Sequence, residues 1–270
     1  MRVRRFILPV FFILVLLGVA GFMAWANATN EPMAEAQAAL LSDPLVIVEE
    51  GAWLVFRPAA STPKAGLVYY PGGRVDARAY APMARALAQE GYLAVIVPMP
   101  LNLAIFGSER GQDVLEAYPS ISNWVIGGHS LGGAMAARFV YRNPGLVQGL
   151  ALMASYPASS DNLSEYDIEA ISIYGTRDGV MAAGALEESR ALLPADTRWI
   201  TIEGGNHAQF GWYGDQAGDL PATISHLEQQ QIIIEATLEL LKALGGVQTS
   251  SNPSNPVISI SYPYPNRIMP

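Results

Sequence analysis

The sequence is poor in side chains that bind metals or form disulfides. Its 270 residues include no cysteine and only three histidines. Without cysteine, the fold has no disulfide bonds and the chain cannot carry a lipid anchor on a cysteine. The histidines are scattered and form no H-E-x-x-H motif, and Asp215 and Asp219 lack the neighbouring ligands of a calcium loop. The sequence therefore predicts neither a metal site nor a cofactor.

Basic residues are also scarce. The chain has 16 lysines and arginines against 24 aspartates and glutamates, and Arg2, Arg4 and Arg5 stand at its beginning. The rest of the chain carries a net charge of about −11. A nucleic-acid-binding surface needs basic residues to neutralise phosphates, so this balance argues against a nucleic-acid partner. With 51% hydrophobic and 15% charged residues, the chain is expected to be globular rather than disordered.

One long apolar run follows the three arginines. Residues 6–26 contain no charged side chain, and 21 residues of helix span about 30 Å, the thickness of a hydrocarbon core. Two interpretations remain open: a signal peptide cleaved at Ala24-x-Ala26 or Ala26-x-Ala28, or an uncleaved anchor, which the length of the run favours. In both cases the arginines stay in the cytoplasm and the rest of the chain is exported. We therefore expect a single-pass membrane protein with its main domain on the extracytoplasmic side, or a secreted protein after signal cleavage.

Composition divides the chain into four parts. They are the N-terminal signal or anchor (1–28), a polar linker with a short helix (29–44), one domain (45–246) and a proline-rich tail (247–270). In the domain, a predicted hairpin (45–58) precedes alternating apolar strands and amphipathic helices. The predicted strands cover 65–73, 92–100, 122–128, 147–157, 168–178 and 197–207, and the predicted helices cover 76–91, 130–143, 182–194 and 225–246. This alternation predicts a three-layer α/β fold, with helices on both faces of a mostly parallel sheet and the antiparallel hairpin at its edge.

Polar residues follow three of the predicted strands. Ser130 lies in "IGGHSLGGAMA" (126–136), Asp178 closes "AISIYGTRD" and His207 closes "ITIEGGNH". Because the carboxyl ends of parallel strands share one edge of a sheet, we expect these side chains to meet there. A serine hydroxyl becomes a nucleophile when a histidine takes its proton, and a carboxylate then orients the histidine. The stretch from Gly128 to Gly132 fits G-x-S-x-G, and the chain order Ser, Asp, His is the one expected for that motif.

Each of the three positions has alternatives. A phosphate-binding loop needs a lysine or the G-x-G-x-x-G spacing, and neither is present, so a structural turn is the alternative role for Ser130. His129, inside the motif, and His226, at the start of the last helix, are poorly placed as bases. The acids that compete with Asp178 are Asp161, Asp167 and Glu203, while Asp215 follows the histidine and breaks the expected order.

Four segments together resemble the α/β-hydrolase superfamily, especially its small serine-esterase and dienelactone-hydrolase-like branch. The segments are "YYPGGRVDARAYAPMARALAQEGY", "GGHSLGG", "IYGTRDGV" and "EGGNHAQFGWYGDQ", and the likeness covers roughly residues 45–245. The resemblance implies Ser130 as nucleophile, His207 as base and Asp178 as the orienting acid. It also implies an oxyanion hole made by the backbone N–H groups of Leu131 and Gly73, with Arg74 as the alternative to Gly73.

The sequence departs from neighbouring branches of that superfamily in two ways. Dienelactone hydrolases typically carry a cysteine nucleophile, so a chain without cysteine is not expected to cleave dienelactones. Many lipases carry "HGG" or "HGGG" before the oxyanion residue, whereas this chain has "YPGGR", which keeps the backbone donor.

The expected activity is hydrolysis of carboxylic esters with short to medium acyl chains through an acyl-enzyme intermediate. Only the ten residues "ASSDNLSEYD" separate Pro157 from Ile168, so we expect no large cap over the site. The apolar segment "LNLAIFG" (101–107) is expected to line the mouth, and "FGWYG" (210–214) either packs in the core or forms a pocket wall. The expected partners are a small-molecule ester and, through the N-terminal segment, a membrane. An acyltransferase with the same triad and a non-catalytic binding domain on a hydrolase fold are the alternatives.

Overall fold

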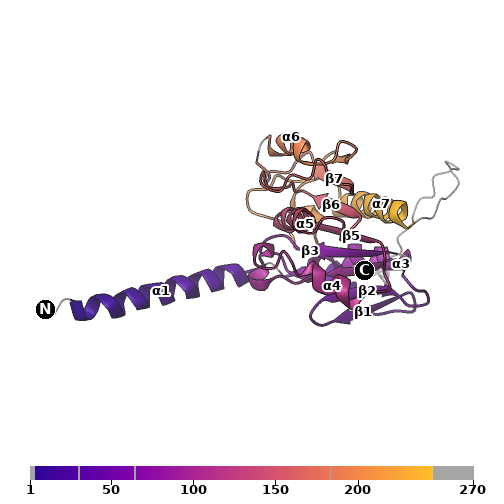
Figure 1. Ribbon diagram of the computed structural model, residues 1–270. Helices are drawn as coiled ribbons and strands as arrows, with labels where there is room; N and C mark the ends of the chain where they lie inside the picture. Colours follow the sequence, from indigo (N-terminus) through magenta and orange to yellow (C-terminus); the bar gives the residue numbers. More distant parts are fainter. Residues whose placement is uncertain (1–3, 30, 64, 183, 246–270) are drawn as a thin grey trace, which may run out of the picture.

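The fold is built on one eight-stranded sheet, seen in a computed structural model that describes residues 4–29, 31–63, 65–182 and 184–245. The strand order is β1-β2-β4-β3-β5-β6-β7-β8. The strands from β3 to β8 run parallel, and β1 and β2 add an antiparallel hairpin at one edge. Their bounds are β1 Val46–Glu50, β2 Leu54–Pro58, β3 Gly66–Tyr70, β4 Leu93–Ile96, β5 Trp124–His129, β6 Gly149–Met153, β7 Glu169–Gly175 and β8 Arg198–Ile202. This confirms the predicted fold class (Figure 1).

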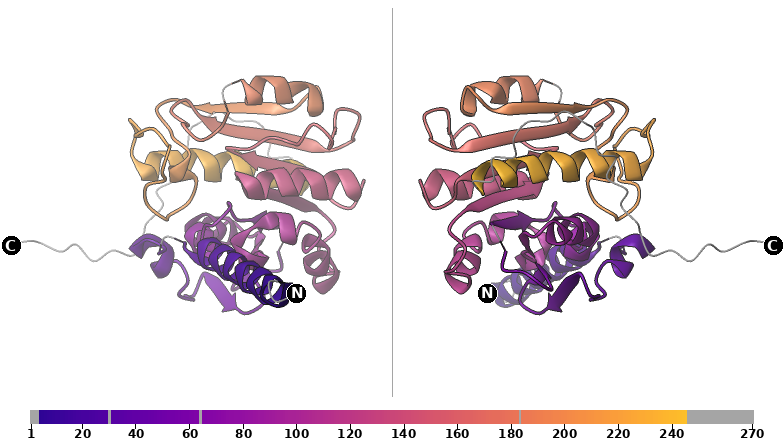
Figure 2. Two further views of the ribbon diagram at one scale, coloured as in Figure 1. Left: turned by 90° about the vertical axis from the view of Figure 1, so that its left-hand side faces the viewer. Right: turned by 90° about the vertical axis from the view of Figure 1, so that its right-hand side faces the viewer.

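Helices cover both faces of the sheet, as Figure 2 shows from its two ends. One face packs against α3 (Ala81–Gln89) and α7 (His226–Leu244), and the other against α4 (Gly111–Ala117) and α5 (Leu131–Arg142). The predicted helix 76–91 is broken in two, because the 3₁₀ helix η1 (Ala77–Tyr80) ends where Pro82 starts α3. Shorter elements complete the chain: α2 Ala34–Ala38, η2 Pro100–Asn102, η3 Ala104–Phe106, α6 Ala185–Ser189, η4 Arg190–Leu192 and η5 Ala208–Phe210.

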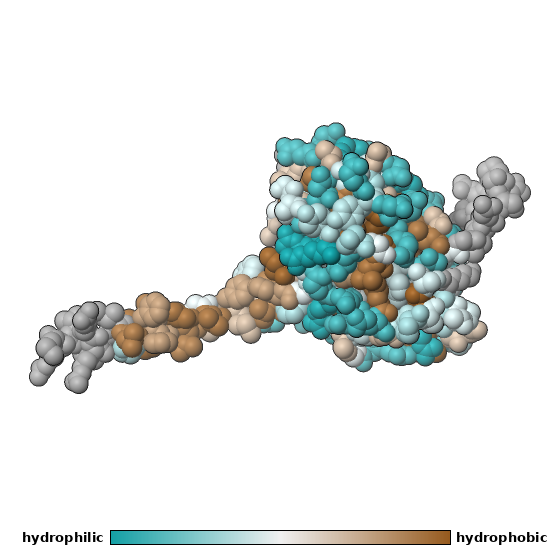
Figure 3. Space-filling model, in the orientation of Figure 1, coloured by the Kyte–Doolittle hydropathy of each residue, from teal (hydrophilic) through white to brown (hydrophobic). Residues whose placement is uncertain are grey.

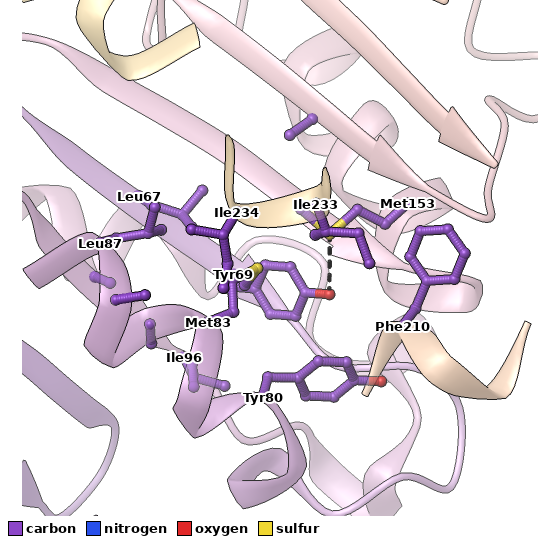
Figure 4. Packing of buried hydrophobic residues seen from close by; sticks show 14 of the residues in the cluster. Leu67, Tyr69, Tyr80, Met83, Leu87, Ile96, Met153, Phe210, Ile233 and Ile234 are labelled. Carbon is purple, nitrogen blue, oxygen red and sulfur yellow. Dashed lines mark hydrogen bonds between the residues drawn. The ribbon is translucent and has the colours of Figure 1, made fainter. Parts of the chain in front are cut away.

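The core forms because the central strands are apolar along their whole length. All residues of β3, β4, β5 and β6 are buried, as expected for parallel strands covered on both faces. On the α3 and α7 side, Tyr69 and Tyr80 pack with aliphatic residues of both helices, and the Tyr69 hydroxyl lies 3.4 Å from the Met153 sulfur (Figure 4). This packing fixes the strand ends from which the site is built.

The connection between β6 and β7 is short. Residues 154–168 contain neither a helix nor a strand, and all of them are described. As predicted, no large cap domain is inserted here, so only loops surround the carboxyl ends of these strands.

An apolar helix, α1 (Arg4–Asn27), projects from the domain (Figures 1 and 3). Its segment Leu8–Asn27 is 20 residues long, with a mean hydropathy of 2.4, and is long and apolar enough to cross a membrane. A signal sequence near an N-terminus has the same properties. The structure therefore contains the predicted apolar helix, which fits either an anchor or a signal.

The stretch predicted as a linker lies against the domain. Helix α2 packs on η1 and α3, and Arg85 of α3 donates hydrogen bonds to the carbonyls of Ala39 (3.1 Å) and Leu41 (2.6 Å). The predicted tail 247–270 lies outside the described residues.

Candidate active site

Ser130 lies on a sharp turn between β5 and α5. Its backbone has φ 53° and ψ −123°, a conformation that is strained for any residue other than glycine. The turn closes because Gly128 and Gly132 have no side chains: a Cβ at Gly132 would stand 2.1 Å from the Tyr70 carbonyl oxygen, and one at Gly128 would stand 2.5 Å from it. Such strain occurs where a nucleophile is raised above a sheet at the start of a helix. The geometry therefore favours a nucleophilic role for Ser130 over a plain structural turn.

His207 and Asp178 form a buried pair. The His207 Nδ1 lies 2.7 Å from the Asp178 Oδ2, and the two side chains are 1% and 2% exposed. An ionised carboxylate only accepts hydrogen bonds, so Nδ1 carries a proton, and in the neutral imidazole Nε2 is the nitrogen that keeps a lone pair. Nε2 is buried and has no hydrogen-bond partner in the described part of the chain. His207 therefore has a nitrogen available to accept a proton.

Ser130 and His207 line the same pocket. It has a volume of about 270 Å³, and its other lining residues are Leu131, Ala134, Ala154, Ser155, Tyr156, Val180 and Met181. The structure thus brings the serine and the histidine to one cavity and joins the histidine to Asp178. A shared cavity is what proton transfer from the serine hydroxyl to the imidazole needs first, although no hydrogen bond joins the two side chains in the described structure.

The environment of Asp178 keeps its carboxylate charged. Burial on its own would raise the pKa of Asp178, but the hydrogen bond and positive charge of His207 lower this pKa overall, together with N–H donors from Met181 and Val180. Those two N–H groups lie 2.9 and 2.8 Å from Oδ1. Asp178 can therefore hold one imidazole tautomer and stabilise the imidazolium that forms when His207 takes a proton.

The competing acids are placed elsewhere. Asp161 is paired with Arg138 at 3.0 Å, and Asp167 and Glu203 are exposed. None of the three has a recorded contact with His207 in the described structure, so the geometry favours Asp178.

The other two histidines do not line the pocket. His129 is buried, its Nδ1 lies 2.9 Å from the Tyr80 hydroxyl, and its ring is stacked on Phe210 at 5.5 Å. Burial, with the nearby His207 charge, holds the pKa of His129 well below its usual value. His226 is stacked on Trp212 at 3.9 Å, and burial lowers the pKa of His226 to about 4. Both rings therefore have packing roles.

Two backbone N–H groups are candidates for an oxyanion hole. Gly73 follows β3 and Leu131 begins α5, and a Cβ at Gly73 would lie 3.2 Å from the Leu131 Cδ2. Neither N–H has an acceptor recorded among the described residues, whereas the Arg74 N–H donates to the Asn102 carbonyl at 2.7 Å. The geometry therefore favours Gly73 over Arg74 as the first donor, with Leu131 as the second.

Two residues whose roles in the site are not predicted from the sequence, Tyr80 and Asp219, bind the candidate loops through hydrogen bonds. The Tyr80 hydroxyl accepts the Gly72 N–H at 3.0 Å and bonds the His129 Nδ1, so it connects the oxyanion loop to the serine turn. Asp219 accepts the N–H groups of Ala208 (2.8 Å) and Gly179 (2.9 Å), next to His207 and Asp178. A tyrosine on an apolar helix face and an aspartate in a glycine-rich loop give no sequence signal for these roles.

We predict that Tyr80→Phe destabilises the protein and slows catalysis. The change leaves the Gly72 N–H and the His129 Nδ1 buried without a partner, at a cost of about 1–3 kcal/mol for each group. The two costs add to about 2–6 kcal/mol, so the apparent Tm of the full-length protein in detergent should fall by roughly 4–12 °C. Tyr92→Phe is the matched control, because no hydrogen bond is recorded for that hydroxyl in the described structure. Equal Tm values for the two variants would contradict the role given to Tyr80.

The aromatic segment after His207 belongs to the core. Phe210, Trp212 and Tyr213 are 1%, 5% and 4% exposed, and none lines the pocket. Of the two roles considered for residues 210–214, the structure supports packing. The segment 101–107 does not line the pocket either; its Phe106 packs on Phe22 of α1 at 6.5 Å.

The chain was compared with known proteins by sequence and by structure. A sequence model described as "Alpha/beta hydrolase family" matches residues 66–231. A search of curated proteins finds no match. Similar solved structures include a CIB-like hydrolase from Thermoplasma acidophilum, with 16% identity and a TM-score of 0.56 over 74% of this chain and 100% of that one.

Two further structures have similar folds. A protein from Klebsiella pneumoniae assigned as a dienelactone hydrolase has 16% identity and a TM-score of 0.56 over 72% of this chain and 98% of its own. A carboxylesterase from Bacillus subtilis has 11% identity and a TM-score of 0.55, and the match covers 77% of this chain and 95% of the esterase. At identities of 11–16%, these structures show that the fold is shared. The family is shown by the sequence model, which matches more than half of the chain. The chain therefore belongs to the alpha/beta hydrolase family.

Proposed function

We propose that the protein is a serine hydrolase that cleaves carboxylic esters through an acyl-enzyme. The observation that carries the proposal is the buried 2.7 Å pair of His207 and Asp178, because His207 lines the same pocket as Ser130. The family and the carboxylesterase from Bacillus subtilis, which shares the fold, support this class of reaction.

In the proposed mechanism, His207 takes the proton of Ser130 as the hydroxyl oxygen attacks the ester carbonyl. The N–H groups of Gly73 and Leu131 stabilise the oxyanion of the tetrahedral intermediate. His207 then gives its proton to the leaving alcohol, and the C–O bond breaks to leave an acyl group on Ser130. Water, deprotonated by His207, attacks this acyl group; the bond between the acyl carbon and the Ser130 oxygen then breaks, His207 returns its proton to that oxygen, and the acid is released. Asp178 holds the orientation of His207 in both halves of the reaction.

The pocket suits short to medium acyl chains. Its volume of about 270 Å³ is below the range of about 300–1,000 Å³ that is typical of small-molecule sites. Leu131, Ala134, Val180 and Met181 give it apolar walls, and Val180 at the rim is 38% exposed. With only short loops around it, the site is open to small esters that arrive from solvent.

We also propose that α1 stays in the chain and tethers the domain to the extracytoplasmic side of a membrane. The length and hydropathy of Leu8–Asn27 support a span, and the arginines that precede it favour a cytoplasmic N-terminus.

The substrate proposal is tested by rates on p-nitrophenyl acetate, butyrate and palmitate, measured with full-length protein in a non-ionic detergent. We expect kcat/KM to be higher for acetate and butyrate than for palmitate, because the pocket is small. A clear preference for palmitate would overturn the acyl-chain assignment. The same preparation is treated with a fluorophosphonate probe, which should label Ser130; a wild-type protein that is not labelled would overturn the serine mechanism.

A further inference from the structure

The end of α1 is bonded to the domain beside the candidate oxyanion hole. The Arg74 guanidinium donates to the carbonyls of Trp25 and Ala28, both at 2.9 Å, and lies over the Trp25 ring at 4.5 Å. The Asn102 amide donates to the Ala26 carbonyl at 3.3 Å. The last carbonyls of a helix have no partners inside it, so these side chains act as its C-terminal cap. A cationic side chain is also favourable at this end of a helix.

Apolar packing accompanies these hydrogen bonds. Ala26 is fully buried, and the ring of Phe22 meets the ring of Phe106 edge-on. The end of α1 therefore contacts the domain through Ala26 and one face of Phe22, while Trp25 stays 50% exposed and the turns before it are exposed (Figure 3).

The loops that hold α1 have strained backbones. Arg74 has φ 59° and Asn102 has φ 53°, both in the left-handed region that favours glycine. The Arg74 N–H and the Asn102 carbonyl join the two residues at 2.7 Å. Strain of this kind persists where surrounding contacts over-determine the conformation, and here those contacts include the hydrogen bonds to the end of α1 as well as bonds within the domain.

The residues on both sides of Gly73 are fixed by hydrogen bonds. On one side, the Gly72 N–H is bonded to Tyr80 inside the domain. On the other side, Arg74 is bonded to α1 and to Asn102. Leu103, next to Asn102, closes the space beside Gly73, with its Cδ2 3.7 Å from where a Cβ would be. The direction of the Gly73 N–H therefore depends on the end of α1.

We propose that residues 22–28 are part of the catalytic structure: the end of α1 positions the oxyanion loop through Arg74, a positioning residue, and the working protein retains this segment. The inference rests on the proposed function, because it assigns Gly73 to the oxyanion hole. Cleavage after Ala26 or Ala28 would detach Trp25 and Ala26 from the domain and leave Arg74 without its ring and at least one of its acceptors. The segment is thus retained as an anchor and is not discarded as a signal.

The test uses full-length protein in detergent and counts active sites with the fluorophosphonate probe. Arg74→Ala should lower kcat per labelled serine roughly tenfold, less than the loss of about 10²–10³ that follows removal of an oxyanion donor. KM should stay within about twofold, because the oxyanion forms only in the transition state. Arg74→Lys should recover part of the rate, since an ammonium can still reach a carbonyl. Asn102→Gly, which keeps the positive φ but removes the amide, should give a smaller loss in the same direction.

Arg57→Ala is the matched control, because Arg57 pairs with Glu49 on the edge hairpin, away from α1. A second check is the double variant Trp25→Ala/Arg74→Ala, whose loss in kcat should be less than the product of the single losses if the two side chains act together.

Three outcomes would overturn the inference. The first is an Arg74→Ala variant whose kcat per labelled serine equals that of the wild type. If only its number of active sites or its Tm is lower, the role of Arg74 is purely structural. The second is strictly multiplicative losses in the double variant. The third is a mature, fully active protein whose intact mass shows that it begins after Ala26 or Ala28. If the wild type is not labelled at Ser130, the proposed function itself fails, so the two failures are distinct.

Discussion

Ser130→Ala is expected to lower kcat for p-nitrophenyl acetate by a factor on the order of 10⁶, the loss seen when a triad loses its nucleophile. In the proposed mechanism the Ser130 hydroxyl oxygen forms the bond to the acyl group, and no other group can replace it. The fluorophosphonate label should disappear with the activity. The fold should survive, because alanine adopts the φ of 53° at no greater cost than serine and the hydrogen bonds recorded for Ser130 come from its backbone.

Ser160→Ala is the control for this experiment. Ser160 is exposed, and its hydroxyl bonds only Asp161 at 3.0 Å among the described residues. Its variant should keep the wild-type rate and label. Labelling of Ser130→Ala at the wild-type level would show that the nucleophile has been assigned to the wrong residue.

Asp178→Asn is expected to lower kcat about 10⁴-fold with little change in KM, the size of effect found when a triad aspartate becomes an amide. An asparagine that keeps the Val180 and Met181 bonds through its oxygen turns its NH₂ group toward the His207 Nδ1. Nδ1 must then accept, so the proton moves to Nε2 and the base loses its lone pair. The residual rate should rise with pH as hydroxide replaces the general base.

Asp167→Asn is the matched control, since Asp167 is an exposed acid in the loop before β7. Wild-type kinetics are expected for it. The assignment of the orienting acid would fail if Asp178→Asn kept its activity while Asp167→Asn lost it.

Much of the fold could be predicted because its signals are local. The strands from Gly66 to Met153 are continuous apolar runs, which is how parallel strands buried on both faces appear in a sequence. Ser130, Asp178 and His207 each follow a parallel strand (β5, β7 and the more exposed β8), so the topology brings them to one edge of the sheet. The roles of these residues remain predictions for the experiments above.

The residues that hold the site could not be predicted in this way. In the sequence, Tyr80 looks like one more apolar residue of a helix. Its hydrogen-bonding role depends on the break between η1 and α3 and on His129, which lies 49 positions away. In the sequence Arg74 resembles an ordinary loop arginine, yet its partners lie 46 and 49 positions earlier, at Ala28 just after α1 and at Trp25 within it. Contacts across such distances arise from tertiary packing and leave no periodic pattern in the sequence.

In the membrane-tethered protein that we propose, the contacts at the end of α1 would also set how the domain faces the bilayer. Arg74 follows β3 and Asn102 follows β4, so the helix leaves from the same sheet edge at which Ser130 follows β5 (Figure 1). A flexible linker between the helix and the domain would let the domain reorient freely relative to the bilayer. A helix whose last turn is hydrogen-bonded to the domain would instead hold the carboxyl edge of the sheet at a constant distance from the membrane and at a constant tilt. Small esters from the aqueous phase would then enter a pocket that opens at a fixed distance from the bilayer surface.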